Sequence, residues 1–205
     1  MCWSGIPSSA PPHPFELQAI SAATSASRRQ EFLTGRYCAR QAALQLGLEL
    51  GPLSRDPETG APLWPTEVVG SITHTSKVAA AVLALSRSFR GVGLDLESQS
   101  RLIAPGISRH VCTPAEKVLL EHLPETERDL RLKLIFSAKE SIYKCLFPQV
   151  LQTIGFQDAE VMFQERTFHF TLLRDLSGVY PQGFSGQGRW MLLSDLVVTG
   201  TWISQ

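Results

Sequence analysis

The stretch from Lys77 to Glu97, KVAAAVLALSRSFRGVGLDLE, decides the fold of this chain. It holds two apolar runs, VAAAVLAL and GVGLDLE, separated by the mostly polar segment SRSFR. Apolar runs rich in valine and leucine and joined by a short polar segment are typical of a β-hairpin. The preceding run VVGSITH, at residues 68–74, predicts another strand. The middle of the chain is therefore predicted to form a sheet.

Helical patterns lie on both sides of this segment. Between residues 26 and 47 apolar side chains recur at helical spacing, and Gly47 suits a C-terminal cap. The segment TPAE, residues 113–116, predicts the start of a helix. The Thr113 hydroxyl would cap the helix, the proline suits the first helical position, and Glu116 stands at the third helical position. A longer helix is predicted over residues 125–146, ending before Pro148.

The chain from Ile154 onward is predicted to form an antiparallel sheet. AEVMFQ, TFHFTLL and RWMLLSDLVVTGTWI predict strands, with turns expected at SGVYPQG and SGQG. Helices combined with hairpin-connected strands indicate an α+β fold. We expect two packed α+β halves, residues 1–98 and 99–205, with the seam near residues 98–112.

Composition narrows the class of protein. Hydrophobic residues make up 43% of the 205 residues, and 19 basic residues balance 19 acidic ones, so overall charge gives no reason to expect nucleic acid. The longest apolar run, Val78–Leu85, is too short to cross a membrane. The N-terminus is not typical of a secretory signal, and Cys2, Cys38, Cys112 and Cys145 form no C-x-x-C pair. We therefore expect a cytoplasmic protein with reduced thiols.

Two acidic residues end the second apolar run. In a strand, Asp95 and Glu97 point to the same face. At about 5 Å and an effective dielectric of about 20, their repulsion is on the order of 3 kcal/mol. A Mg²⁺ ion between the two carboxylates would make the pair favourable. The alternative is a solvated edge of the hairpin.

The segment FSAKESIYK, residues 136–144, adds a third acid. On a helix Glu140 and Lys144 share one face. Glu140 is a candidate third metal ligand, and Lys144 a candidate counter-charge for a phosphate. The alternative is an ordinary ion pair on a helix surface, which contributes only about 0.3–0.5 kcal/mol.

A third group of candidates is basic. Arg28, Arg36 and Arg40 lie on one helix, Arg55 lies in the following loop, and His74 ends VVGSITH. Guanidinium groups one turn apart can grip a phosphate, although helix arginines also serve solubility and a histidine at a strand end is often structural. Together with the three acids, these basic residues suit a reaction at a pyrophosphate. The sequence has neither the GxxxxGK[ST] loop of P-loop enzymes nor the GxGxxG motif of dinucleotide-binding folds. The residues alone indicate a Mg²⁺-dependent enzyme acting on a phosphorylated cofactor.

Four motifs, in order, resemble those of the 4′-phosphopantetheinyl transferases. GVGLDLE and FSAKESIYK resemble the paired signature of that family, and FLTGRYCARQAALQLG and GAPLWPTEVVGSITH resemble upstream motifs of its enterobactin-synthetase-activating, surfactin-type branch. The similarity runs from about Arg28 to Pro148. It implies two similar α/β subdomains with coenzyme A in the cleft between them. The implied reaction moves phosphopantetheine from coenzyme A to a serine of an apo carrier protein and releases adenosine 3′,5′-bisphosphate.

The resemblance also implies roles for single residues. Asp95, Glu97 and Glu140 match the ligands of Mg²⁺, for which Mn²⁺ could substitute. Either Glu140 or Glu116 would deprotonate the serine through a water. The candidate contacts to coenzyme A are Arg28, Arg36, Arg40, Arg55, Gly60, Ala61, Pro62, Thr73, His74, Lys139 and Lys144.

Two positions depart from the surfactin-type pattern. Those enzymes carry a lysine where Ala61 stands, and Arg55 is the candidate replacement for the missing phosphate contact. They also carry a tryptophan where Phe136 stands, and phenylalanine is common in the enterobactin branch. The change at Phe136 therefore leaves the expected activity intact.

The expected protein partners are acyl, peptidyl or aryl carrier domains, which present an acidic helix beside their serine. The segment SRLIAPGISRH offers an apolar patch edged by positive charge. Its candidate contacts are Arg101, Leu102, Ile103, Ile107 and Arg109. The alternative is a mobile loop. The served pathway, whether fatty acid, polyketide, siderophore or other nonribosomal peptide synthesis, stays open, and we expect a monomer that binds neither nucleic acid nor membrane.

Two other functions use the same residues. A Mg²⁺-dependent phosphodiesterase or nuclease would use the three acids and turn over without a carrier protein. A non-catalytic coenzyme A-binding protein would keep the arginines and lose the acids. Because all three acids are present, the transferase is the favoured prediction.

Overall fold

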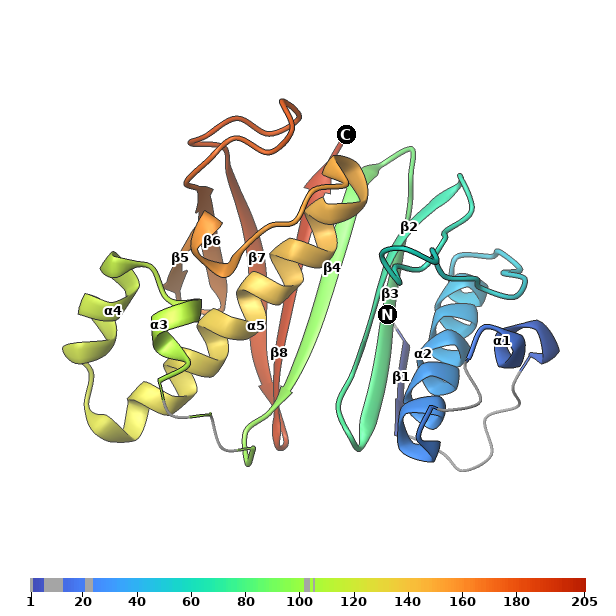
Figure 1. The fold of residues 1–205 in the computed structure, drawn as a ribbon, viewed down its shortest axis with the longest axis horizontal. Helices are drawn as coiled ribbons and strands as arrows, with labels where there is room; N and C mark the ends of the chain where they lie inside the picture. The colour runs from blue at the N-terminus through green and yellow to red at the C-terminus, as the bar shows by residue number, and fades with distance from the viewer. Residues whose placement is uncertain (1, 6–12, 21–23, 102–103, 105) are drawn as a thin grey trace. The chain divides into compact units, whose positions relative to one another are not determined.

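The computed structural model of the protein describes residues 2–5, 13–20, 24–101, 104 and 106–205, and it divides into two compact units (Figure 1). Unit 1 comprises residues 1–92 with 204–205, and unit 2 comprises residues 93–203. The boundary lies within strand β4 (Phe89–Ser98), ahead of the division after residue 98 that we predicted. The acidic pair therefore belongs to unit 2. Helices combined with antiparallel sheets confirm the α+β class.

Unit 1 is one long helix packed on a small antiparallel sheet. The sheet has the order β1-β3-β2, with β1 (Cys2–Gly5), β3 (Val78–Leu85) and β2 (Val68–His74). Helix α2 (Ala26–Gln45) packs on this sheet, and the short helix α1 (Pro14–Gln18) precedes it. Ala39 and Ala43 of α2 and Ala79 and Ala81 of β3 are fully buried. These small side chains let the helix approach the sheet closely.

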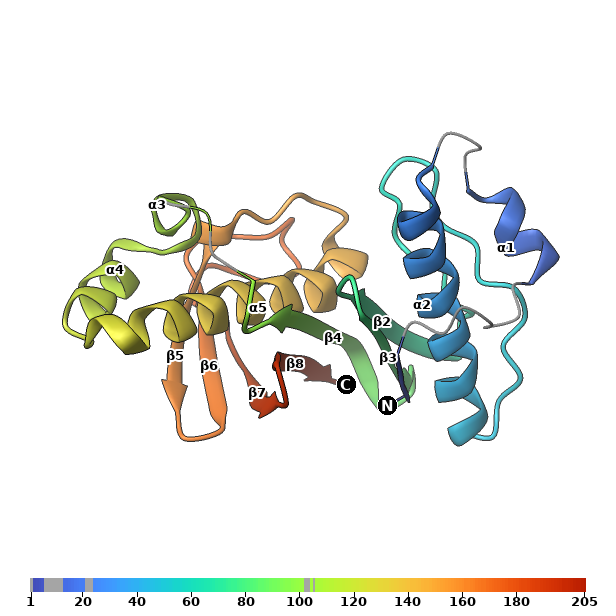
Figure 2. The same cartoon turned by 90° about the horizontal axis from the view of Figure 1, so that it is seen from below.

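Unit 2 is built on a five-stranded antiparallel sheet, and Figure 2 shows helix α5 lying along one face of it. The strand order is β4-β8-β7-β6-β5. The elements beyond β4 are α3 (Ser108–Val111), α4 (Pro114–Glu121), α5 (Glu125–Val150), the 3₁₀ helix η1 (Phe156–Asp158), β5 (Ala159–Gln164), β6 (Thr167–Leu172), β7 (Ser185–Leu193) and β8 (Leu196–Ser204). The core lies between α5 and the sheet, with Ile142 and Leu146 of α5 packed in the same cluster as Phe168 and Phe170.

One glycine sets the distance between β4 and α5. A Cβ atom at Gly93 would lie 1.8 Å from the backbone oxygen of Ser141, so only glycine fits at this crossing. The close approach brings the following residue pair, Leu94-Asp95, against the middle of α5. Gly93 therefore positions the acidic pair relative to the helix that carries Glu140 and Lys144.

Two expectations about the last third of the chain were wrong. SGQG is not a turn but the start of β7, where Gly186 and Gly188 leave room for the rings of Phe170 and Phe168. The hairpin turn falls instead between Leu193 and Leu196. In addition, α5 continues through Pro148 to Val150, because a proline in the last turn removes a single amide while apolar burial favours the helix. Within the described ranges, every helix is too short or too polar to pass through a bilayer.

Candidate active site

Asp95 is the central residue of the acidic group in unit 2. Its side chain is buried, with only 6% of its surface exposed. The Oδ1 atom accepts a 2.6 Å hydrogen bond from Lys144 Nζ, and Oδ2 accepts one of 2.8 Å from Ser137 Oγ. Lys144 and Ser137 are seven residues apart on α5 and so lie on the same helix face. The buried carboxylate is thus paired and hydrogen-bonded, as burial of a charge requires.

Glu97 and Glu140 extend this group. Burial, and then repulsion from Asp95, raises the pKa of Glu97 to about 7, although Arg101 and Lys144 oppose the shift. Burial followed by repulsion from Asp95 also raises the pKa of Glu140. The three predicted metal ligands therefore interact with one another, and we call them the acid cluster.

The acid cluster has the oxygen ligands that a hard dication prefers. In this structure, however, its central carboxylate, Asp95, forms an ion pair with Lys144. In the part of the chain that the structure describes, no three Asp, Glu, His or Cys side chains form a group ready to hold a metal ion. The ammonium of Lys144 lies 2.6 Å from Asp95 Oδ1 and pairs with this carboxylate. Carboxylates are the ligands that Mg²⁺ and Mn²⁺ prefer, and a nearby cation would oppose the burial and the repulsion from Asp95 that raise the pKa values of Glu97 and Glu140. The donor set thus fits such an ion.

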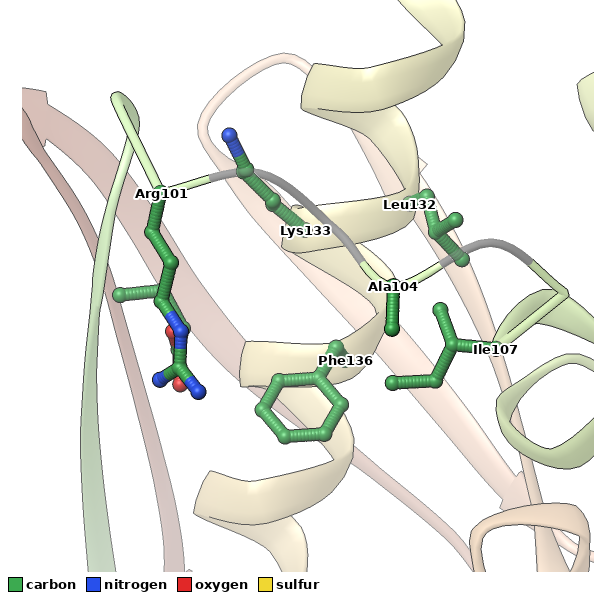
Figure 3. A pocket seen from close by; sticks show the side chains of 7 residues that line it. Arg101, Ala104, Ile107, Leu132, Lys133 and Phe136 are labelled. Carbon is green, nitrogen blue, oxygen red and sulfur yellow. The ribbon is translucent and has the colours of Figure 1, made fainter.

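Two cavities of unit 2 adjoin the acid cluster. The first, about 160 Å³, has Glu97 in its wall, and Figure 3 shows Phe136, Ala104 and Ile107 facing one space with Arg101 beside it. The second, about 240 Å³, has Glu140 in its wall. Each cavity thus offers space for a ligand next to one of the acids.

The carrier-docking residues predicted from SRLIAPGISRH are only partly gathered around the first cavity. Arg101 and Ile107 line it, Arg109 is exposed on α3, and Leu102 and Ile103 lie outside the described residues. The sequence reasoning missed Lys133, which also lines this cavity and donates to the backbone oxygen of Gln99. Lys133 lies three residues before Phe136 on the same helix, and this spacing could have predicted that the two side chains share a face.

Glu116 and Lys139, both predicted at the site, form a buried ion pair. Their side chains are only 1% and 2% exposed, and Lys139 Nζ donates to Glu116 Oε2 over 2.7 Å. The Glu116 carboxylate also accepts 2.8 Å bonds from the amides of Thr113 and Val161, and Lys139 donates to the Val111 oxygen. Burial lowers the pKa of Lys139, and Glu116 opposes that shift. These bonds tie α4, α5 and β5 together, which supports a structural role, while the catalytic and coenzyme roles stay predictions.

Unit 1 brings Arg28 and His74 together. Arg28 Nη1 lies 2.7 Å from His74 Nε2 and 3.2 Å from a carboxylate oxygen of Glu31. His74 Nδ1 lies 3.5 Å from the same oxygen. Thr73, the preceding residue, is buried in β2. The arginine is largely exposed, so it can reach an anion while it stays near the histidine.

Arg36 is buried with incomplete pairing. It is 6% exposed, and its guanidinium carbon lies 3.9 Å from the centroid of the Phe32 ring. Burial, with repulsion from Arg55 and Arg28, lowers its pKa to about 10, although Glu16 opposes the shift. Its Nε atom has no hydrogen-bond partner among the described residues. A buried donor near two further cations is costly unless an anion binds there.

Arg40 differs from Arg36, since it has a carboxylate partner. It forms an ion pair with Glu16, a buried residue that also accepts a hydrogen bond from the amide of Leu53. This pairing ties α2 to α1 and to the loop before β2, and it supports a structural role for Arg40. The predicted contact of Arg40 with coenzyme A stays a prediction.

The loop predicted to contact the adenine is a compact turn. The backbones of Arg55 and Pro62 form an isolated antiparallel β-bridge. The amide of Asp56 donates a 2.8 Å hydrogen bond to the backbone oxygen of Ala61. The Asp56 carboxylate accepts 2.7 and 2.8 Å bonds from Thr59, and Gly60 has a positive φ of 73°. The turn holds Gly60 exposed with Ala61 and Pro62 half-buried.

The predicted acids lie with Lys144 in unit 2, and the predicted arginines lie with His74 in unit 1. Residues 15–84 match the family model of the 4′-phosphopantetheinyl transferase N-terminal domain, and residues 91–185 match that of the 4′-phosphopantetheinyl transferase superfamily. The chain belongs to this family, as its motifs indicated, and its enzyme class is that of a phosphopantetheinyl transferase.

Curated relatives agree with the family models. The chain is 34% identical to the 4′-phosphopantetheinyl transferase Npt of Nocardia iowensis, across 91% of this chain and 87% of that protein. It is also 34% identical to the 4′-phosphopantetheinyl transferase PptT of Mycobacterium tuberculosis, across 92% and 84% of the two chains. Enterobactin synthase component D of Salmonella typhi is 33% identical across 65% of this chain and 54% of that protein.

Proposed function

We propose that this transferase moves phosphopantetheine from coenzyme A to a serine hydroxyl of apo carrier proteins, and that adenosine 3′,5′-bisphosphate leaves. Family membership supports the donor and acceptor classes. The observation that carries the proposal is the acid cluster with Lys144 against it, since a pyrophosphate needs both a cation site and a nearby ammonium. We also expect the protein to act in the cytoplasm as a monomer.

Asp95, Glu97 and Glu140 would hold the Mg²⁺ ion, which Mn²⁺ could replace. When bound, such an ion neutralises pyrophosphate oxygens and the leaving group. Ser137 fixes the orientation of Asp95 by its hydrogen bond, and Lys144 would offset charge on the phosphates. These roles assign the cation site to one strand and one helix of unit 2.

The serine must lose its proton, and two carboxylates were candidates for the base. Both oxygens of Glu116 already accept hydrogen bonds, and the residue is buried. Glu140 is only half-buried and lies in the wall of a cavity of about 240 Å³, so a water can reach its carboxylate. We therefore favour Glu140, acting through a water.

In unit 1 the phosphates of coenzyme A would bind Arg28, Arg36 and His74. The unpaired Nε of buried Arg36 supports this assignment, since an anion would supply its missing acceptor. Arg55 lies near enough to Arg36 to lower its pKa, which supports Arg55 as the replacement for the lysine absent at Ala61.

The carrier protein would bind at the first cavity, where Arg101 and Lys133 supply positive charge next to Ile107 and Phe136. An acidic carrier helix is complementary to this surface. Reversing Arg101 and Arg109 to glutamate should raise the KM for carrier protein and leave the KM for coenzyme A unchanged. A uniform loss of stability in this variant would contradict the assignment.

One assay tests the whole proposal. The protein is mixed with coenzyme A, Mg²⁺ and an apo carrier protein, and the carrier mass is followed. Gain of one phosphopantetheine arm, lost in Asp95→Ala while the fold persists, is the expected result. Hydrolysis of coenzyme A without a carrier would favour the phosphodiesterase alternative, and coenzyme binding without any turnover would favour the non-catalytic one.

A further inference from the structure

Unit 2 contains a third cavity, which is not lined by any member of the acid cluster. Its volume is about 350 Å³, and it lies between α4, the first half of α5 and β5. Its walls include Leu119 and Leu123, Ile135 of α5, and Val161 and Phe163 of β5. The volume is at the lower end of the range of small-molecule sites, about 300–1,000 Å³, which are likewise mostly apolar.

Apolar side chains around this cavity are exposed to solvent. Leu119 is 58% exposed and Met162 is 67% exposed, and both belong to the lining. Apolar surface that is exposed next to a hollow gains free energy when a ligand covers it. The cavity is therefore suited to an aliphatic chain.

The cavity also has one cation that lacks a carboxylate partner. Arg131 lies in its lining, with its guanidinium carbon 5.2 Å from the centroid of the Phe163 ring. Among the described residues, Arg131 forms no ion pair, whereas the only acid in the lining, Glu116, is neutralised by Lys139 at 2.7 Å. Among the residues that line the cavity, Arg131 is thus the charge without an oppositely charged partner, and a planar guanidinium is suited to a carboxylate.

We propose that this cavity is a binding site for an aliphatic carboxylate of medium chain length. The chain would lie along Leu123, Ile135 and Phe163, and the carboxylate would pair with Arg131. This site is separate from the proposed transferase function, since it uses no residue of the acid cluster and needs neither coenzyme A nor a carrier protein.

Octanoate and 1-octanol, which share a chain and differ in charge, test the proposal on the full chain by calorimetry. Octanoate should bind saturably and about fivefold more tightly than octanol, as expected for one partly exposed charge pair. Arg131→Met should remove that preference, and Leu119→Trp should fill the opening and weaken both ligands. Arg189→Met, at an exposed arginine of β7 outside this cavity, is the matched control and should change neither affinity.

Thermal denaturation of each variant separates lost binding from lost folding. Equal affinities for the two ligands, or an octanoate affinity unchanged in Arg131→Met, would overturn the carboxylate assignment. Absence of saturable octanoate binding up to about 5 mM, a free energy near −3 kcal/mol, would overturn the site itself. Binding of an acidic apolar peptide without octanoate binding would assign the cavity to a protein segment and would also overturn the proposal.

Discussion

Replacing Lys139 with methionine should strongly destabilise unit 2, and the structure allows the size of the loss to be worked out. The side chain of Glu116 is 1% exposed, and the substitution removes the ammonium 2.7 Å from its carboxylate. Breaking a buried ion pair by removing one partner typically costs about 3–5 kcal/mol. The carboxylate keeps two amide donors, from Thr113 and Val161. We therefore expect a loss of about 3 kcal/mol in the free energy of unfolding, near the lower end of that range.

Urea denaturation at neutral pH measures this loss, and a second variant tests its cause. Glu116→Gln combined with Lys139→Met removes both charges, so it should recover more than half of the lost free energy. Lys77→Met, at an exposed lysine, is the control and should stay within about 0.5 kcal/mol of the parent protein.

Two results would refute this reasoning. A loss below about 1 kcal/mol in Lys139→Met would show that the pair is not held in a desolvated environment. A double variant no more stable than the single one would show that the unpaired carboxylate is not the source of the loss. Separately, if Glu116→Gln is stable and folded but has no transferase turnover, Glu116 acts in the reaction.

Three further predictions follow from the described contacts. Gly93→Ala should cost about 3 kcal/mol or more in urea denaturation because its Cβ would lie 1.8 Å from a backbone oxygen of α5, whereas Gly200→Ala, with 3.7 Å to its nearest neighbour, should be nearly neutral. Because the folded-state pKa of Glu97 is raised to about 7, metal-free protein should lose about 1–2 kcal/mol of stability, after allowance for solvent screening, as the pH rises from about 4.5 to 7. Thermal melts should show that Mg²⁺ removes this pH dependence. Arg36→Met should weaken coenzyme A binding by at least about tenfold in calorimetry, because it removes a charge-assisted hydrogen bond to a phosphate. Arg40→Met should chiefly lower the melting temperature, because it leaves the buried Glu16 carboxylate without its ion-pair partner.

Local pattern predicted most of the secondary structure. The strand VVGSITH coincides with β2, and the two apolar runs of KVAAAVLALSRSFRGVGLDLE coincide with β3 and β4. The hairpin predicted from these runs was wrong, because β3 pairs with β1 and β2 on its two sides while β4 lies at the edge of the other sheet beside β8. The capping box of Thr113 and Glu116 starts α4 as predicted. SGQG was misread because glycine is common in turns, whereas here the rings of residues 168 and 170 require it. That requirement comes from a neighbouring strand and has no local signal.

The same distinction holds for the candidate site. Spacing within one strand and one helix was enough to group Asp95 with Glu97 and Glu140 with Lys144. Spacing could not show that Arg40 is paired with Glu16, because that partner lies in a separate helix. Ser137 carried a signal that was not used, since it lies two helical turns before Lys144 and so faces the same strand.

Lys144 explains how the chain tolerates its acidic pair before any cation binds. Repulsion between two carboxylates about 5 Å apart is on the order of 3 kcal/mol at an effective dielectric of about 20. The structure offsets it in two ways, by the ammonium 2.6 Å from Asp95 and by the raised pKa of Glu97, which leaves that acid partly protonated near neutral pH. Under the proposed function, Asp95, Glu97 and Glu140 would hold the cation, and Lys144, which donates to Asp95 in this structure, would offset charge on the pyrophosphate.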